Sequence, residues 1–391
     1  MLNRTMTSTL HRLAKVFSVV AITGPRQSGK TTLAKSAFPE KVYVNLENPA
    51  ERSFAEEDPK GFLDRFPDGA IFDEAQRWPD LFSYLQCIVD ENPVFGKYIL
   101  TGSQQFGLLA GTGQSLAGRI GMTQLLPLTL EEIPAVQEKT ISLDKLMIQG
   151  SYPAIYSRDL SPNEWFSSYV ATYIERDVRQ VLKIHDLSAF QRFLRLCAGR
   201  NGQLLNLSAL AGETGISHST AGSWLSVLES SYIIHLLHPY HKNFGKRLVK
   251  APKLYFLDTG VASWLLGIRS ADLLALHPFR GALFESLVVS EFTKSLFNKG
   301  LRTKLFFWRD NNGLETDLVF ESGTKLQPIA IKSGSTVTSD YIKAGLKSIR
   351  FAPEETLDPW LIYGGEESYT RSGVNVIGWR DLAHKADCSA G

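Results

Sequence analysis

A glycine-rich segment at residues 24–31 has the residue types and the spacing of a phosphate-binding loop. It reads Gly24-Pro25-Arg26-Gln27-Ser28-Gly29-Lys30-Thr31, fits GxxxxGK[ST], and lies between a β-branched run and a stretch of helical period. Backbone N–H groups of such a loop turn inward around phosphate oxygens, helped by the positive end of the next helix. Lys30 would neutralise the β- and γ-phosphates, the Thr31 hydroxyl would ligate Mg²⁺, and Thr32 would complete the cradle. The segment predicts binding of ATP with Mg²⁺, against the alternative of a chance glycine-rich turn.

Two consecutive carboxylates end a short apolar run at residues 70–74. Asp73 would hold Mg²⁺ through water, and Glu74 would orient and deprotonate the attacking water, since hydrolysis needs a base beside the metal. A solvated turn is the alternative interpretation. The second acid favours hydrolysis over phosphoryl transfer to a small molecule.

Residues further along the chain could complete this catalytic site. Ser103, or the neighbouring Gln104, follows an apolar run and could hydrogen-bond the lytic water or the γ-phosphate. Arg119 or Arg77 could supply the guanidinium that stabilises phosphoryl transfer. A simple turn and surface arginines are the alternatives, and the sequence does not choose between the two arginines.

The elements that must position these residues alternate in type. Strand-like runs at 16–23, 41–46, 70–72 and 98–101 alternate with helical periods at 31–38 and 80–90, which predicts a parallel α/β sheet covered by helices. A last strand at 125–128 and a capped helix start at Thr129 would close this domain, so we predict an ATPase core at 1–135. Residues 136–200 are predicted to form a helical lid or linker, because Trp165, Phe166, Tyr169, Val170, Tyr173 and Ile174 recur at helical spacing.

Composition is ordinary for a folded chain and excludes little. The 391 residues are 43% hydrophobic, the net charge is +2, and the three cysteines are far apart with no CxxC pair. No apolar run is long enough to cross a bilayer, and the N-terminal residues lack a signal-peptide pattern. We therefore expect a cytoplasmic protein with no membrane span, no disulfide and no zinc.

Residues 201–270 predict a winged helix-turn-helix, with two short helices followed by strand-like runs. Ser219, Thr220 and Ser223 open the second helix with small polar groups that can approach phosphates or base edges. A basic stretch without acidic residues follows, and it contains Lys242, Lys246, Arg247, Lys250 and Lys253. The module is predicted to bind DNA, and the alternative is a helical module used only for packing or subunit contact.

Several motifs together resemble one family. They are Gly-Pro-Arg-x-x-Gly-Lys-Thr-Thr-Leu, Asp-Glu-Ala-Gln-Arg, Leu-Thr-Gly-Ser, Gly-Arg before Leu-Pro-Leu, and the segments 149–153, 173–178, 253–260 and 281–285. Over roughly residues 15–335 the chain resembles bacterial and archaeal AAA-like P-loop ATPases with a C-terminal DUF4143 region. The resemblance implies an AAA+-type core, a winged helix, and an α/β restriction-endonuclease-like domain of the PD-(D/E)xK nuclease type at 271–391. It also implies a homo-oligomer, with a hexamer among the options, because AAA-type sites usually borrow an arginine from a neighbour.

The implied nuclease site lacks one acid. Asp317 and Lys332 match the pattern, and Glu285 matches its accessory acid, but Ala330 stands where the second metal ligand belongs. Losing a ligand from a site with few carboxylates should weaken Mg²⁺ binding, so we expect a degenerate site without nuclease activity. Two functions stay open: an ATP-driven DNA-binding machine, and an ATP-gated switch or interaction protein that binds no DNA. An active Mg²⁺-dependent DNA nuclease is the third, less favoured alternative.

Overall fold

The computed structural model describes residues 2–103, 116–158, 160–174, 186–240, 250–302, 304–310, 313–350, 352 and 354–389. The chain divides into two compact units. The first consists of Met1–Pro127, Ser230–Tyr232 and Phe297–Leu301, and the second of Leu128–Glu229, Ile233–Leu296 and Arg302–Gly391. In the part of the chain that the structure describes, no helix is both long and apolar enough to span a bilayer.

The first unit is built on a five-stranded parallel sheet with the strand order β2-β3-β4-β1-β5. The strands are β1 (Val19–Thr23), β2 (Val42–Asn45), β3 (Ala70–Asp73), β4 (Tyr98–Gly102) and β5 (Ile120–Gln124). Four of them confirm the predicted runs. The strand predicted at 125–128 is wrong: Leu125 still donates its N–H to the Thr23 carbonyl at 2.7 Å, but Pro127 has no N–H with which to extend the pairing.

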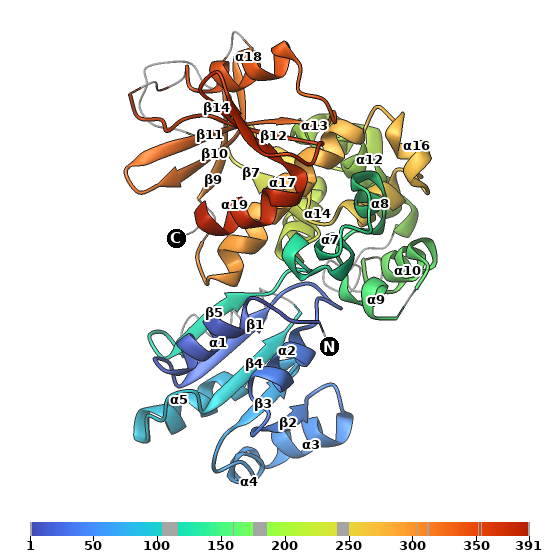
Figure 1. Ribbon diagram of the computed structural model, residues 1–391. Helices are drawn as coiled ribbons and strands as arrows, with labels where there is room; N and C mark the ends of the chain where they lie inside the picture. The colour runs from blue at the N-terminus through green and yellow to red at the C-terminus, as the bar shows by residue number, and fades with distance from the viewer. Residues whose placement is uncertain are drawn as a thin grey trace. The chain divides into compact units, whose positions relative to one another are not determined.

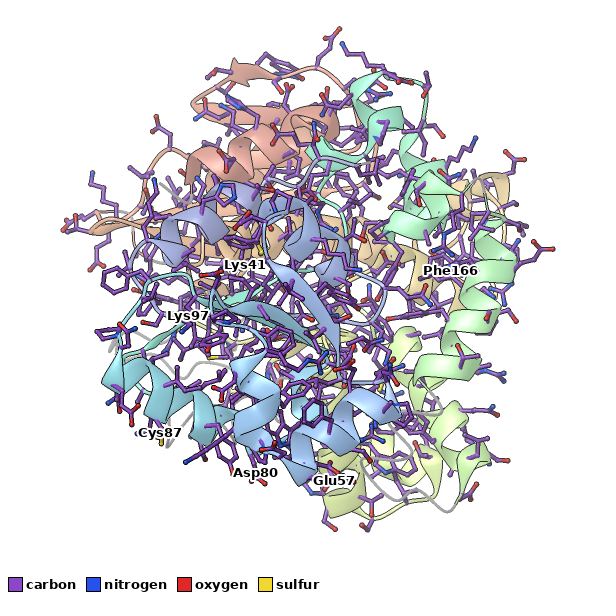
Figure 2. The ribbon with its side chains drawn as sticks, turned by 90° about the horizontal axis from the view of Figure 1, so that it is seen from below. Lys41, Glu57, Asp80, Cys87, Lys97 and Phe166 are labelled. Atoms are coloured by element: carbon purple, nitrogen blue, oxygen red, sulfur yellow. The ribbon has the colours of Figure 1, made fainter. Side chains whose placement is uncertain are left out.

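Helices cover both faces of this sheet, as Figure 1 shows. They are α1 (Thr7–Ala14), α2 (Lys30–Ala37), α3 (Pro49–Glu57), α4 (Pro59–Asp64), the 3₁₀ turn η1 (Ala75–Arg77) and α5 (Leu81–Glu91). Alternate residues of β1 belong to different apolar clusters: Val19 packs with residues of α4 and α5, whereas Val20 packs with residues of α1 and α2. A strand buried on both faces requires the continuous apolar run that the sequence has. Figure 2 shows Cys87 on α5, where its free thiol is exposed.

The second unit begins with short helices. They are η2 (Leu130–Glu132), α7 (Pro134–Gln137), α8 (Leu143–Gln149), α9 (Pro153–Ser157), α10 (Pro162–Tyr169), the π-helical turn η3 (Val170–Ile174) and α12 (Leu187–Gly199). The capped start at Thr129 is confirmed, since Thr129 and Glu132 form a capping box. Trp165, Phe166, Tyr169 and Val170 are buried as their spacing predicts, while the side chains of Tyr173 and Ile174 lie outside the described residues.

Two of the family-like motifs meet in this unit and stabilise its packing. The Asp258 carboxylate accepts hydrogen bonds from the Ser151 N–H at 2.7 Å, the Ser151 hydroxyl at 2.8 Å and the Val261 N–H at 2.9 Å. Gly260 leaves room for the Phe166 ring, because a Cβ there would lie 2.3 Å from the ring. These motif residues therefore have a structural role.

Next in the chain come α13 (Leu207–Thr214), α14 (His218–Ser230) and an antiparallel sheet with the order β6-β8-β7. Its strands are β6 (Gln203–Leu204), β7 (Ile234–Leu237) and β8 (Lys253–Phe256), and α15 (Thr259–Leu265) and α16 (Ala271–Ala275) follow. The two helices and the strands after them have the order predicted for a winged helix-turn-helix.

The C-terminal part contains a six-stranded mixed sheet with the order β13-β14-β12-β11-β10-β9, visible at the top of Figure 1. Its elements are α17 (Arg280–Asn298), β9 (Leu305–Arg309), β10 (Glu315–Ser322), β11 (Lys325–Lys332), α18 (Ser339–Ser348), β12 (Trp360–Tyr363), β13 (Tyr369–Arg371), β14 (Val374–Gly378), η4 (Trp379–Asp381) and α19 (Leu382–Ser389). The long helix α17 and the strands β9 to β11 contain the apolar runs of the tail.

Candidate active site

The phosphate loop connects the end of β1 to the start of α2. Gly24 has φ 149°, and a Cβ there would lie 2.1 Å from the Leu125 carbonyl oxygen, so the chain requires glycine. Gly29 has φ 95° and directly precedes α2, while Gln27 takes a left-handed φ of 61°. The buried Ser28 hydroxyl has no hydrogen-bond partner among the described residues. The loop thus has the turn and the unused polar capacity of an anion cradle.

Lys30 is the first residue of α2 and is buried, with 6% of its surface exposed. Its ammonium donates to the Gly24 carbonyl at 2.9 Å and to the Pro25 carbonyl at 2.8 Å, so it spans the loop. Burial lowers the pKa of Lys30 to about 8, although Glu74 and Asp73 act in the opposite direction. Lys30 is therefore a cation that a bound phosphate would stabilise.

ATP affinity should consequently fall as the pH rises above about 8, the pKa of Lys30. Bound phosphates raise the pKa of Lys30. At a pH between the pKa of Lys30 in the free protein and its pKa in the complex, ATP binding takes up one proton. The affinity for ATP therefore drops about tenfold per pH unit in this range. Isothermal titration of a non-hydrolysable ATP analogue with Mg²⁺ across this range measures the effect. Lys30→Arg is the control. A guanidinium stays protonated across this range, so the ATP affinity of the variant should not change with pH. An equally steep fall in Lys30→Arg would assign the titration to another group.

Asp73 ends β3 beside the phosphate loop and accepts three hydroxyl groups. Thr31 lies 3.0 Å and Tyr43 2.7 Å from its Oδ2, and Thr101 donates to its Oδ1. Burial and the bond to Asp73 raise the pKa of Tyr43 well above its ordinary value, so the phenol remains a donor. The carboxylate is thereby fixed toward Thr31.

Glu74 follows Asp73 in the left-handed region, with φ 55°. Ser103, just after β4, donates to Glu74 Oε2 at 3.2 Å, and the Gln76 amide donates to the same oxygen and lies 3.4 Å from the Ser103 hydroxyl. Because β4 lies between β1 and β3, its end places Ser103 between the phosphate loop and the acids. Gln104, the alternative to Ser103, lies outside the described residues.

The oxygen donors at this edge fit Mg²⁺. The Thr31 hydroxyl and the Asp73 carboxylate are hard ligands only 3.0 Å apart, and Mg²⁺ prefers one or two such protein ligands together with phosphate oxygens. Thr31 and Asp73 would hold the ion, which would neutralise negative charge on the phosphates of a bound nucleotide.

Arg26 of the phosphate loop and the candidate Arg77 lie near each other, whereas the candidate Arg119 lies elsewhere. Arg26 and Arg77 both face Glu47, at 3.9 Å and 3.6 Å, and Arg77 belongs to η1 directly after Glu74. Arg119 instead precedes β5; its carbonyl accepts the Val19 N–H at the start of β1, and its guanidinium pairs with Asp90. The length of β1 separates Arg119 from the phosphate loop, so the structure does not bring the Arg119 guanidinium to Asp73 and Glu74 of the same chain.

The predicted DNA contacts are described only in part. Ser219 and Ser223 are exposed on α14, but the Ser219 and Thr220 hydroxyls contact the Ser217 hydroxyl at 2.9 and 2.7 Å, near the start of the helix. Lys250 is exposed, whereas Lys242, Lys246 and Arg247 lie outside the described residues. Lys253 does not belong to an exposed patch, since it is 4% exposed. DNA binding by this module stays a prediction.

The predicted degenerate nuclease residues are brought together. Glu285, Asp317, Ala330 and Lys332 line one cavity of about 930 Å³ in the second unit. Lys332 lies 3.3 Å from Asp317, which also accepts the Ile331 N–H at 2.8 Å. No group of three His, Cys, Asp or Glu side chains that could hold a metal occurs among the residues described by the structure.

Three positions beside the predicted acids escaped the analysis of the sequence, and a fourth was assigned to another place. Tyr43, Thr101 and Gln76 reach Asp73 or Glu74, whereas Lys253, predicted for the basic stretch, reaches the acids of the nuclease-like cavity. Polar residues on β2 and β4 could have indicated the first two, because parallel strands lie side by side in one sheet. Nothing in the sequence indicated the contact of Lys253 with the acids.

Three family models match consecutive stretches of the chain. Residues 16–134 match an AAA domain, residues 140–272 match a domain of unknown function (DUF8612), and residues 280–382 match a second domain of unknown function (DUF4143). The phosphate loop, the parallel sheet and the AAA match define residues 16–134 as an ATPase-like P-loop domain. The AAA and DUF4143 matches confirm the resemblance, noted in the motifs, to AAA-like P-loop ATPases with a C-terminal DUF4143 domain.

Relatives and solved structures are similar to this chain to different extents. The uncharacterized proteins Rv2008c of Mycobacterium tuberculosis and Mb2031c of Mycobacterium bovis are each 29% identical over 364 residues, which cover 92% of this chain and 79% of theirs. The Walker-type ATPase PABY2304 of Pyrococcus abyssi is 13% identical with a TM-score of 0.45, covering 68% of this chain and 96% of its own. The RuvB Holliday junction branch migration motor of Thermotoga maritima is 18% identical with a TM-score of 0.31, covering 59% and 88%. The assignment of the nucleotide site therefore rests on the residues of this chain.

Proposed function

We propose that this protein hydrolyses ATP with Mg²⁺ and couples the hydrolysis to DNA binding or remodelling. The observation that carries the ATPase proposal is the grouping of Lys30, Thr31, Asp73, Glu74 and Ser103 at one edge of a single parallel sheet. Phosphoryl transfer is catalysed mainly by positioning and charge stabilisation, and these five side chains are of the types that both tasks need.

Each side chain has a separate proposed role. The loop amides and Lys30 bind the β- and γ-phosphates, and Thr31 and Asp73 hold Mg²⁺. Glu74 takes the proton of the attacking water, while Ser103 and Gln76 fix the orientation of its carboxylate. Arg77 is placed near the site within the chain, whereas Arg119 could act only on a neighbouring copy of a homo-oligomer. Release of inorganic phosphate from ATP, measured with Mg²⁺ and with EDTA, tests the proposal.

DNA coupling is the finer part of the proposal and is supported by the basic stretch after β7 and the exposed small residues of α14. We expect DNA to stimulate phosphate release and to bind with steep salt dependence. The double charge reversal Lys246→Glu with Arg247→Glu should lower DNA affinity about tenfold or more and remove the stimulation, with ATP hydrolysis in the absence of DNA unchanged. Fluorescence anisotropy and a phosphate-release assay measure the two effects. Binding and stimulation that survive the reversal would exclude this stretch as the contact.

Two other functions predict different results. An ATP-gated switch that binds no DNA predicts hydrolysis without any DNA stimulation or DNA binding. An active nuclease predicts Mg²⁺-dependent DNA cleavage that Asp317→Ala abolishes, and Ala330 at the position of a metal ligand disfavours it.

A further inference from the structure

The cavity of the second unit carries an excess of positive charge. Five basic and three acidic side chains occur among the described residues that line it. The basic ones are Lys253, Arg309, Lys332, Lys347 and Arg350, and the acidic ones are Glu285, Glu315 and Asp317. They come from different parts of the chain, since β8 supplies Lys253, α17 supplies Glu285, and strands β9 to β11 supply most of the others. A cavity that gathers so many charges is built for a charged ligand.

Lys253 supplies the positive charge that the acids of this cavity need. Its ammonium pairs with Glu315 and lies 4.0 Å from Glu285, its side chain is only 5% exposed, and the Phe307 ring lies 5.5 Å away. Burial lowers the pKa of Lys253, but Glu285, Asp317 and Glu315 outweigh burial and raise it above the ordinary value. The side chain is therefore a permanent cation among the carboxylates.

Groups of the protein already bind one carboxylate oxygen of Glu285, one of Asp317 and both of Glu315. Glu285 Oε2 accepts the Tyr255 hydroxyl at 3.1 Å, and Glu315 pairs with Arg309 at 3.3 Å as well as with Lys253. Asp317 is held by Lys332. Burial and the charge of Asp317 raise the pKa of Glu285 to about 7, which further reduces its value as a metal ligand.

Two cations of the cavity remain available for a ligand. Lys347 on α18 and Arg350 just after it are exposed, and no ion pair joins either of them to a residue within the described ranges. Phosphate groups are the anions that such lysine and arginine side chains bind most readily. The volume is at the upper end of the range of about 300–1,000 Å³ typical of ligand sites, and exposed cations at its border suit a ligand that continues beyond it.

We propose that this cavity binds the phosphodiester backbone of a nucleic-acid strand without a metal ion. In it the Lys253 ammonium takes the place of the divalent cation, and Lys347 and Arg350 receive the phosphates. The inference rests on the proposed DNA coupling. It adds a second contact, made by residues other than those predicted on α14 and at 242–250, and gives the reason why the nuclease-like site needs no magnesium.

The test measures binding of a labelled single-stranded DNA to the full-length protein in EDTA, without nucleotide. Lys347→Glu with Arg350→Glu should lower the affinity about tenfold or more and reduce the salt slope by about 1.4, because two phosphate contacts are lost. Lys325→Glu with Lys343→Glu is the matched control: both lysines are exposed, neither lines the cavity, and the charge change is the same. An equal loss in the control, or no loss in the cavity variant, would overturn the proposal.

Competition identifies the ligand. Unlabelled DNA should displace the labelled strand, whereas AMP and polyglutamate at equal anion concentration should not. Displacement by AMP as effective as that by DNA would show a nucleotide site, and equal displacement by polyglutamate would show a site for acidic protein; either result contradicts a strand site.

A metal titration tests Lys253 itself. Both proteins carry Asp73→Asn, which removes the metal ligand beside the phosphate loop. With Asp73→Asn alone, Mn²⁺ should leave the midpoint of thermal unfolding unchanged. With Lys253→Met added, Mn²⁺ should raise the midpoint, because three carboxylates have lost the Lys253 cation. An unchanged midpoint in Lys253→Met would overturn the role of Lys253. If Lys253→Met does not fold, the DNA measurement, which replaces only exposed residues, decides the proposal.

The two proposals can fail separately. The cavity variant should hydrolyse ATP at the wild-type rate in the absence of DNA, because its residues belong to the second unit. If the wild-type protein hydrolyses no ATP, the proposed ATPase activity is refuted. If the cavity variant nevertheless loses DNA binding, the inference about the cavity still holds.

Discussion

Glu74→Gln is expected to slow ATP hydrolysis by about 10²–10⁴-fold while ATP affinity stays near the wild-type value. An amide keeps the shape of the side chain and can still accept the hydrogen bond of Ser103, which lies 3.2 Å from the carboxylate. It cannot take a proton from water. Single-turnover phosphate release gives the rate of the chemical step, and titration with a fluorescent ATP analogue gives the affinity.

Glu47→Gln is the matched control for this substitution. Glu47 lies at the same sheet edge and pairs with Arg26 and Arg77, but its side chain is 44% exposed and makes no contact with Glu74 or Ser103 among the described residues. Its removal should change the rate by no more than a few-fold, since exposed ion pairs contribute little. Hydrolysis by Glu74→Gln at the wild-type rate would show that another group, or water alone, serves as the base.

Lys30→Ala should weaken ATP binding by about 10²-fold or more, which corresponds to about 2.7 kcal/mol. The substitution removes the ammonium that donates to the loop carbonyls of Gly24 and Pro25, and with it the positive charge that would neutralise the phosphates. The fold should persist, because a lysine whose pKa is lowered by burial is costly to keep charged inside the protein. Isothermal titration measures the affinity, and thermal unfolding confirms that the variant is folded.

Lys35→Ala serves as the comparison on the same helix. Lys35 is exposed on α2. Its ammonium lies 3.3 Å from the centre of the Tyr43 ring and makes no hydrogen bond to a described residue of the phosphate loop. Equal charge is lost in both variants, so a purely long-range electrostatic effect would weaken binding in both. Loss confined to Lys30→Ala locates the effect at the loop, whereas equal loss would remove Lys30 from its assigned role.

The sequence was sufficient for those parts of the site in which neighbours in the chain are neighbours in space. The phosphate loop is one such part, because glycines at 24 and 29 permit positive φ angles that the turn into α2 requires. Asp73 and Glu74 are another, since they directly follow a strand whose apolar run is unmistakable. Strands β1, β3 and β4 could be predicted because burial on both faces requires an uninterrupted apolar run, whereas the edge strand β2 is only partly buried.

Long-range pairing was beyond such local patterns. The strand Ile120–Gln124 reads as polar and glycine-containing, and only its place beside β1 makes it a strand. The sequence indicated Arg119 as a candidate for stabilising phosphoryl transfer. The direction of β5, however, places Arg119 beside the start of β1, at the end of the strand opposite to the phosphate loop.

By itself, the sequence determined that this protein has a phosphate loop with two acids after a buried strand, because backbone geometry and apolar burial act over a few residues. The tertiary structure decided which side chains surround those acids: Tyr43 and Thr101 reach Asp73 from neighbouring strands, and Lys253 enters the acid cluster of the C-terminal cavity from a strand far away in the chain. The strength of an electrostatic interaction depends on the distance between the two charges. The order of the strands sets that distance, because it brings together residues that are far apart in the sequence.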